Sequence, residues 1–203
     1  MTTRSSLIAG CLLLGSVAAA ATSDTKTQLR LDMRKLWDDH AAYTRSYVIS
    51  AIAGLPDTDA VAQRLLKNQD DIGNAIKPYY GEEAGRKLAT LLRDHIKIAG
   101  EVVRAAKAGQ TTELTAAHGR WSQNGKDIAA LLSGANPNWS KTEMESMMQQ
   151  HIDLLTDQVS SRLKKNWAAE MKAYDAGHDH MMMMADTLSE GIEKQFPDKF
   201  AGA

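Results

Sequence analysis

Three histidines lie at matching positions on different predicted helices, and imidazole is a side chain that binds transition metals. His40, His95 and His151 each fall near the middle of a long segment with helical periodicity, on its apolar face. If these helices pack side by side, the three imidazoles converge in one layer. Imidazole suits copper, zinc, iron and nickel, and side chains from facing helices can build a metal site inside a bundle. The positions therefore predict a transition-metal site in the middle of the fold.

The last predicted helix carries further candidate ligands near its own middle. His178, Asp179 and Met182 offer nitrogen, carboxylate and thioether donors on adjacent faces, so the rotation of the helix decides which donor turns inward. The run 178–184, HDHMMMM, mixes imidazole and thioether groups, a combination that favours copper and especially Cu(I). Four consecutive methionines cannot all face one way, so some of them fill gaps in the core. Copper is expected over zinc by a small margin.

Three interpretations of this polar layer stay open. In the first, the chain is a metal-binding bundle that stores, buffers or delivers the ion. In the second, it is a metalloenzyme with three histidine ligands and an open fourth position, where bound water is acidified or oxygen is activated. In the third, the bundle holds no metal, and buried polar groups fix the register of the helices as they do in coiled coils. The sequence favours the first.

Other chemistries lack the residues that they need. A di-iron carboxylate site is built from Glu-x-x-His pairs, and the nearest analogue here is the single Asp175-x-x-His178. Covalent haem attachment needs C-x-x-C-H, which is missing. The sequence also has no Ser-His-Asp arrangement, phosphate-binding glycine loop or dinucleotide motif, so it names no catalytic residue and an enzyme is the less expected outcome.

The elements that must position these histidines are helices. Apolar residues recur at three and four rather than at two, and Ala, Leu, Lys and Glu are abundant, a pattern typical of an all-α protein. Helices are expected over 27–54, 57–76, 82–108 and 111–132, then from a capping box at Ser140–Glu143 to about 165, and over 167–196. The predicted fold is an up-and-down bundle of four long helices with one or two accessory helices.

Glycine and proline mark the predicted turns. Gly54 and Pro56 end the first helix, and the string 77–81, KPYYG, ends the second. Proline cannot continue a helix, and glycine tolerates the positive φ of a helix end. The short connections favour antiparallel neighbours. Residues 22–203 are therefore expected to form a single helical-bundle domain.

The amino terminus reads as a secretory signal over residues 1–21. Arg4 supplies the positive charge, 7–17 the apolar segment and 18–21 an A-x-A cleavage site. Cleavage would remove Cys11, the one cysteine of the chain, which excludes disulfides and thiolate ligands from the mature protein. The expected location is periplasmic or secreted, with no membrane span. A formal net charge of −1 gives no electrostatic case for nucleic acid, whereas a protein partner or a homodimer stays open.

Several strings resemble a family of small, often exported, all-helical bacterial proteins of uncertain function. They are 36–45 with LWDDH at its start, 75–81 (AIKPYYG) and 191–197 (GIEKQFP). The resemblance covers most of the mature chain and implies a helical fold and an exported setting. Such sequences sometimes carry the name glycosyltransferase, but no motif here supports sugar-nucleotide transfer. The resemblance supplies no mechanism.

Overall fold

Helices are the only regular secondary structure in the residues that the computed structural model describes, 13–201, with side chains described from residue 25 onward. The helices are α1 (Leu13–Ala53), α2 (Thr58–Ala108), α3 (Thr111–Ala135), α4 (Lys141–Leu163) and α5 (Trp167–Gln195), followed by a short 3-10 helix (Pro197–Lys199). No strand occurs in this part of the chain. The prediction of an all-α fold is confirmed.

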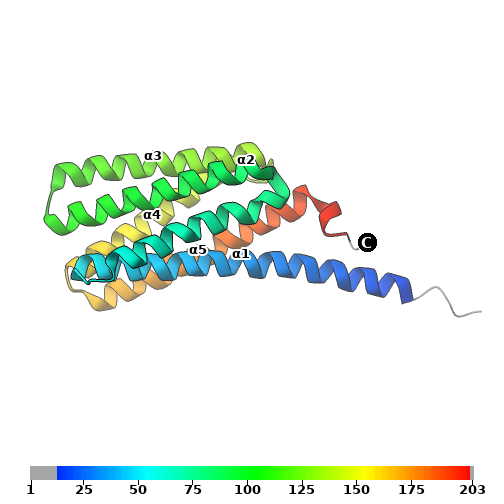
Figure 1. Ribbon diagram of the computed structural model, residues 1–203, viewed down its shortest axis with the longest axis horizontal. Coiled ribbons are helices and arrows are strands. Elements are labelled where there is room, and N and C mark those ends of the chain that lie inside the picture. Colours follow the sequence, from blue (N-terminus) through cyan, green and yellow to red (C-terminus); the bar gives the residue numbers. More distant parts are fainter. Residues whose placement is uncertain (1–12, 202–203) are drawn as a thin grey trace, which may run out of the picture.

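Helix α2 is a helical hairpin rather than one straight rod (Figure 1). The chain stays helical through Pro78 and reverses at Gly81, where φ is 81° and ψ is 171°, a conformation that L side chains rarely adopt. The two halves approach so closely that a Cβ added to Gly73 would lie 2.6 Å from the carbonyl oxygen of Gly85. The predicted reversal at 77–81 is therefore present, but the predicted helix end at Ile76 is too early.

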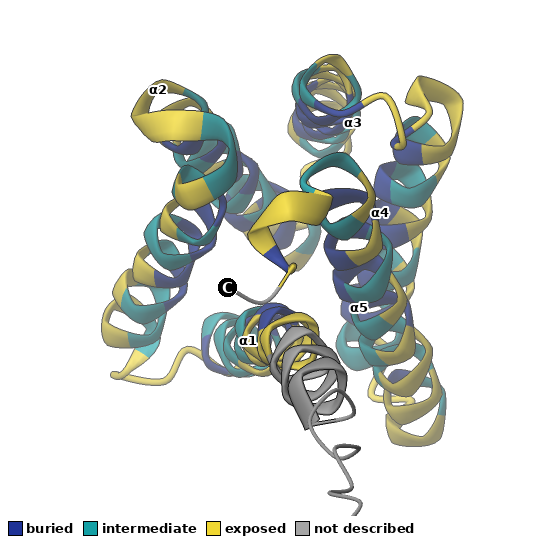
Figure 2. Cartoon of the chain, turned by 90° about the vertical axis from the view of Figure 1, so that its right-hand side faces the viewer, coloured by how far each residue is buried: buried dark blue, intermediate teal, exposed yellow. Residues whose placement is uncertain are grey.

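The helices form a closed ring in which each packs against its neighbours in the sequence. Helix α1 contacts α2, α2 contacts α3, α3 contacts α4 and α4 contacts α5, and α1 against α5 closes the ring (Figures 1 and 2). Ser140 is the N-cap of α4 and forms one half of the predicted capping box, because its hydroxyl accepts a hydrogen bond from the Glu143 backbone N–H at 3.2 Å. The structure does not separate four principal helices from accessory ones, since every helix is a member of the ring.

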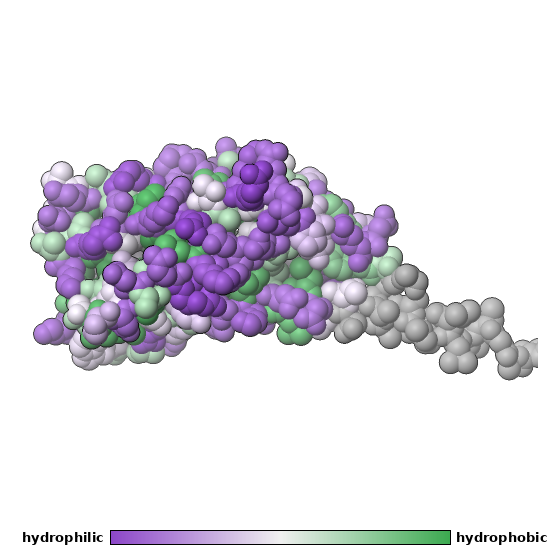
Figure 3. Space-filling model, viewed as in Figure 1, coloured by the Kyte–Doolittle hydropathy of each residue, from purple (hydrophilic) through white to green (hydrophobic). Residues whose placement is uncertain are grey.

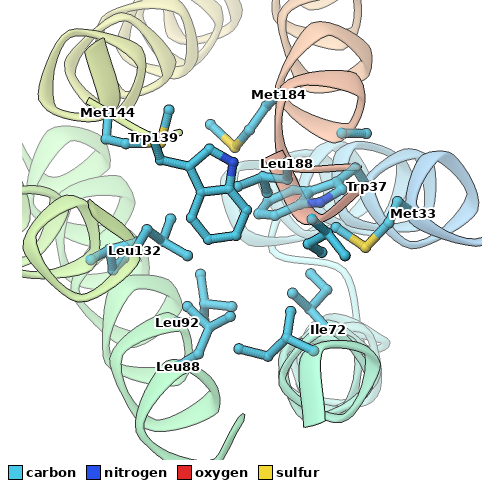
Figure 4. Packing of buried hydrophobic residues seen from close by; sticks show 14 of the residues in the cluster. Met33, Trp37, Ile72, Leu88, Leu92, Leu132, Trp139, Met144, Met184 and Leu188 are labelled. Atoms are coloured by element: carbon cyan, nitrogen blue, oxygen red, sulfur yellow. The ribbon is translucent and has the colours of Figure 1, made fainter. Parts of the chain in front are cut away.

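The interior consists of two hydrophobic clusters at different heights along the bundle. The larger contains Met33, Trp37, Leu92, Met148 and many further aliphatic side chains and methionines (Figure 4). The smaller contains Val48, Val102, Trp121, Ile152 and their neighbours. On α1, α2 and α4 the predicted ligands His40, His95 and His151 fall between residues of the two clusters. The histidines therefore form a polar layer across the core, at the common height that the sequence predicted.

Residues of the segments 75–81 and 191–197, both noted in the sequence, pack together at one end of the bundle. The Tyr80 hydroxyl donates to Oε1 of Gln195 at 2.9 Å and accepts from Nδ2 of Asn136 at 2.9 Å. The ring of Tyr80 meets the ring of Phe196 edge-on, with 5.3 Å between centroids. The strings AIKPYYG and GIEKQFP therefore contact each other, and at this end their residues have a structural role.

The outer face seen in Figure 3 is mostly hydrophilic. Among the described residues, no helix combines the length and the hydropathy needed to cross a membrane. The predicted signal peptide falls on residues 1–12, which lie outside the described part, and on 13–21, for which only the helical backbone of α1 is described. Its cleavage stays a prediction.

Candidate functional site

Three imidazoles from three helices meet in the middle of the core. The ring centroid of His151, on α4, lies 5.7 Å from that of His40 on α1 and 5.7 Å from that of His95 on α2. All three side chains are buried, with 3%, 2% and 8% of the surface of His40, His95 and His151 exposed. The predicted convergence of these residues is present, with His151 between the other two.

His95 has one nitrogen fixed by a hydrogen bond and the other bare. The Asn124 amide is oriented because its Nδ2 donates to the carbonyl oxygen of Leu91 at 3.0 Å. Its Oδ1 lies 2.7 Å from Nδ1 of His95, so the imidazole must donate from Nδ1. Nε2 of His95 then carries a lone pair, and it is buried with no hydrogen-bond partner. A metal-binding histidine typically has this arrangement, with the second ring nitrogen held by another side chain or carbonyl.

His40 contacts a buried pair of amides on α2. Nε2 of Gln69 lies 3.2 Å from Nδ1 of His40, 2.8 Å from the carbonyl oxygen of Leu65 and 3.1 Å from Oδ1 of Asn68. Asn68 in turn donates to the carbonyl oxygen of Leu36 on α1 at 3.0 Å. These amides attach α2 to α1 beside His40 and hold its ring in place from the Nδ1 side.

His151 lies between two small cavities. One, of about 30 Å³, is bordered by His40, Thr44, Gln158 and Met181 among others. The other, of about 20 Å³, is bordered by His40, His95 and Trp121 among others. No hydrogen bond to another described residue acts on the imidazole of His151, whose protonation is governed by burial and by the neighbouring histidines. The ring therefore has space on both sides and no partner that fixes its orientation.

The layer is uncharged at neutral pH. Burial lowers the pKa of His40 and of His95 from 6.5 to about 4. Hydrogen bonding of His40 with Gln69 and Asn68, and of His95 with Asn124, offsets only part of this effect. Burial, followed by repulsion from the charged forms of His95, His40 and His180, lowers the pKa of His151 well below 6.5. Neutral imidazole is the form that binds a metal ion.

The ligands predicted on the last helix, His178, Asp179 and Met182, do not come together at the histidine layer. His178 borders the larger cavity, but its Nε2 pairs with Oδ1 of Asp38 at 2.8 Å near the surface. Asp179 is exposed, and Met182 is half-buried and packs against the larger hydrophobic cluster. Met181 is the residue of α5 that is buried beside the cavity with His40 and His151. The rotation of α5 therefore presents a thioether to this cavity rather than a carboxylate.

His180 of the 178–184 run, which is outside the predicted ligand set, is also buried. Its Nε2 donates to the carbonyl oxygen of Met147 at 2.9 Å, whereas its Nδ1 is buried without a partner. Burial lowers the pKa of this side chain as well. Because it influences the protonation of His151, His180 is a fourth histidine near the layer.

The spacing of neighbouring rings fits a shared metal ion, but the side chains in their present arrangement do not form a metal site. With metal–nitrogen bonds of about 2.0–2.1 Å, two imidazoles on one ion have ring centroids about 5–6.5 Å apart, and both pairs here are 5.7 Å apart. Even so, no three or more His, Cys, Asp or Glu side chains between residues 25 and 201 are arranged so that they could hold a metal ion. Binding by all three histidines would need at least one ring to turn.

A second buried polar group lies between α1, α4 and α5. Glu170 of α5 is 2% exposed, and its Oε2 accepts a hydrogen bond from Nη1 of Arg162 at 2.9 Å. Nη2 of Arg45 lies 3.6 Å from Oε1 of the same carboxylate, and its guanidinium lies over the ring of Tyr174, 4.5 Å from the centroid. We refer to Arg45, Arg162 and Glu170 as the ion cluster.

Comparisons with known proteins give no independent indication of what these residues do. No protein-family model, no curated protein and no solved structure matches this chain. The functional interpretation therefore depends on the geometry and chemistry of the histidine layer itself.

Proposed function

We propose that this chain is an exported metal-binding bundle whose histidine layer holds one transition-metal ion, with copper favoured over zinc. His40, His95 and His151 supply nitrogen donors, and Met181 supplies a thioether in place of the predicted Met182. The role of the protein is to store, buffer or deliver the ion. His178 and Asp179 lie outside the ligand set of this proposal.

The bare Nε2 of His95 is the observation that carries the proposal. A buried acceptor without a donor costs about 1–3 kcal/mol, and Nε2 is such an acceptor because Asn124 fixes the proton on Nδ1. A metal ion at Nε2 would remove this cost. The arrangement also keeps the lone pair available, since the tautomer cannot switch without breaking the bond to Asn124.

The cavities beside His151 and the thioether donor of Met181 support copper as the bound ion. The two cavities beside His151 leave room for its ring to turn toward an ion shared with His40 or His95. Met181 borders the larger cavity together with His40 and His151. Thioether ligands select Cu(I) over harder ions, so a set of two or three imidazoles with one methionine favours copper.

A metal-free polar layer is the second candidate, and the hydrogen bonds of the layer favour it. Gln69, Asn124 and the carbonyl oxygen of Met147 each engage one histidine, as they would if the layer served only to fix helix register. This candidate leaves Nε2 of His95 and Nδ1 of His180 buried without partners. It predicts that replacing a histidine of the layer leaves the affinity of the protein for copper unchanged.

Metal titration distinguishes the two candidates. Purified protein without an affinity tag is titrated anaerobically with Cu(I) against a chromophoric competing chelator. We expect one tightly bound ion per chain, and a loss of affinity of about 100-fold or more in His95→Gln and His151→Gln. Asn124→Leu, which removes the group that orients His95, should weaken binding by about 10–100-fold.

The matched control is His118→Gln, since His118 is half-buried on α3 and contacts Thr156 rather than the layer. Its affinity for copper should equal that of the unmodified protein. Met181→Leu should lower the affinity for Cu(I) and leave that for Zn(II) unchanged. Absence of binding to the unmodified protein, or an equal loss in the His118 variant, would overturn the proposal.

A further inference from the structure

Two polar side chains on the wall of the larger cavity have no hydrogen-bond partner. Thr44 of α1 and Gln158 of α4 border this cavity together with His40 and His151. Oγ1 of Thr44 and Nε2 of Gln158 are buried and unpartnered, and the two side chains are 8% and 5% exposed. Buried polar atoms in folded proteins almost always have a hydrogen-bond partner. Because no described side chain is such a partner for these two atoms, we look for a bound molecule in that role.

The hydroxyl of Thr44 differs from other threonine hydroxyls in this bundle. A threonine within a helix commonly donates to the carbonyl oxygen four residues earlier. Four helical threonines here do so, at 2.8–3.0 Å: Thr90, Thr115, Thr156 and Thr187. Thr44 does not form this bond. Its hydroxyl is therefore free to donate to a group in the cavity.

We infer that Thr44 and Gln158 hold a small ligand that accepts hydrogen bonds, a water molecule or a small anion, at an exchangeable position on the metal ion. This inference rests on the proposed function. The hydroxyl and the amide N–H are both donors, so they match an oxygen or nitrogen atom that carries negative charge. In this cavity His40, His151 and Met181 supply the nitrogen and sulfur donors, and Thr44 and Gln158 supply the hydrogen bonds. His95 reaches the ion from the smaller cavity on the other side of His151.

The dimensions of the cavity fit an ion and one small ligand. A water molecule needs about 10–15 Å³ of space for its centre, and the cavity offers about 30 Å³ of such space. His40 and His151, which border it, are neutral at pH 7, so the charge of the ion is the attraction for an anion. A large substrate is excluded by the same dimensions, which limits the ligand to a few atoms.

The wall beside Gly177 offers a route for exchange. Gly177 borders the cavity, and a Cβ added to it would meet no atom within 4 Å. The next residue, His178, also borders the cavity and has 32% of its side chain exposed. Thin packing at this point gives a small ligand access from solvent without unfolding of the bundle.

Azide binding to the Cu(II)-loaded protein tests the inference. Azide is a small anion that accepts hydrogen bonds, and its coordination to Cu(II) produces a charge-transfer absorption band that can be titrated. We expect saturable azide binding to the unmodified protein, and at least a tenfold weaker affinity in Gln158→Leu and in Thr44→Val. Thr44→Ser keeps the hydroxyl and should restore most of the affinity.

Copper content is measured for every variant, and affinities are compared at equal copper loading. Gln150→Leu is the matched control, because Gln150 lies on the same helix and is exposed; it should bind azide like the unmodified protein. Replacing an unpartnered polar group with an apolar one does not remove a hydrogen bond, so the variants should fold, which circular dichroism and thermal melting check.

Each outcome bears on a different claim. If the copper-loaded protein binds no azide, or if the Thr44 and Gln158 variants bind it as tightly as Gln150→Leu, the inference is wrong and the metal site stands. If the chain does not load copper at all, both the proposed function and the exchangeable position on its metal are overturned.

Discussion

The histidine layer and the ion cluster both place polar side chains inside the bundle, but the two regions satisfy them differently. In the ion cluster, a buried carboxylate lies between two guanidinium groups, Arg162 at 2.9 Å and Arg45 at 3.6 Å. In the layer, the imidazoles are neutral, Nε2 of His95 has no partner, and small cavities lie beside His151. Oε1 of Glu170 also lacks a hydrogen bond, but two guanidinium groups pair the charge of its carboxylate. The histidine layer has no such charge pairing and leaves nitrogen lone pairs unused.

This difference separates a structural role from a binding role. The guanidinium groups neutralise the charge of Glu170, so a ligand there would have to displace an existing ion pair. The histidine layer already carries the cost of burying unpaired nitrogens, so a ligand there would gain interactions without breaking any. Burial alone therefore does not mark a binding site, whereas burial with missing partners and adjacent space does.

Acid should destabilise the fold through the histidine layer, and this is the largest effect we expect. The pKa of His40 and of His95 is about 4 in the folded protein, against about 6.5 in the unfolded chain. As the pH falls below 6.5 the unfolded chain takes up protons first, so stability decreases until about pH 4 and then levels off for these groups. Between pH 7 and pH 4.5 the loss is about 2.5 kcal/mol for each histidine.

Urea unfolding of chelator-treated protein at pH 7 and at pH 4.5 measures this effect. His95→Gln should show a smaller difference between the two pH values than the unmodified protein, because one of the groups that take up protons on unfolding is gone. An unfolding free energy that stays constant across this range would show that the layer is open to protons in the folded state, and the contrast with the ion cluster would fail.

Removing the carboxylate of the ion cluster should be the next largest effect. In Glu170→Gln the guanidinium groups of Arg45 and Arg162 lose their counter-charge in a largely buried position, and breaking such a group by removing one partner costs about 3–5 kcal/mol. Denaturant unfolding at pH 7 measures the change. The affinity for Cu(I) should be retained by the folded fraction, since Glu170 is not a ligand.

The control for this variant is Glu190→Gln on the same helix. Glu190 pairs with Lys194 at 3.0 Å, but both side chains are more than half exposed, so the change in stability should stay below about 0.5 kcal/mol. Similar losses in the two variants would mean that solvent reaches Glu170, and that the ion cluster contributes no more than a surface pair.

The histidine positions could be predicted from the sequence because they depend on helix phase and on turns. His40, His95 and His151 each continue an apolar stripe, and glycine and proline mark the reversals that bring their helices side by side. The last helix was harder to place. Neighbouring residues on a helix point about 100° apart, so a small error in rotation exchanges the exposed Asp179 for the buried His180 and Met181.

The groups that orient the histidines could not be assigned from the sequence, although a signal for them exists. Asn124 follows Trp121 by three residues and precedes Ile128 by four, which makes it a polar residue on an apolar stripe. Asn68 and Gln69 lie in the same way between Leu65 and Ile72. Such positions indicate buried amides, but only the packing of one helix on another reveals which histidine each amide contacts.

The smallest effect we expect comes from the His178–Asp38 pair, which has a short contact like that of the ion cluster but lies near the surface. The contact distance of 2.8 Å is as short as that in the ion cluster, but the two side chains are 32% and 57% exposed. Exposed pairs contribute little because water competes for both partners. Asp38→Asn should therefore change the free energy of unfolding by no more than about 0.5 kcal/mol at pH 7, measured in urea beside Glu170→Gln. A loss of several kcal/mol would show that contact distance rather than burial sets the contribution of polar groups in this bundle, and the distinction between the ion cluster and the surface would not hold.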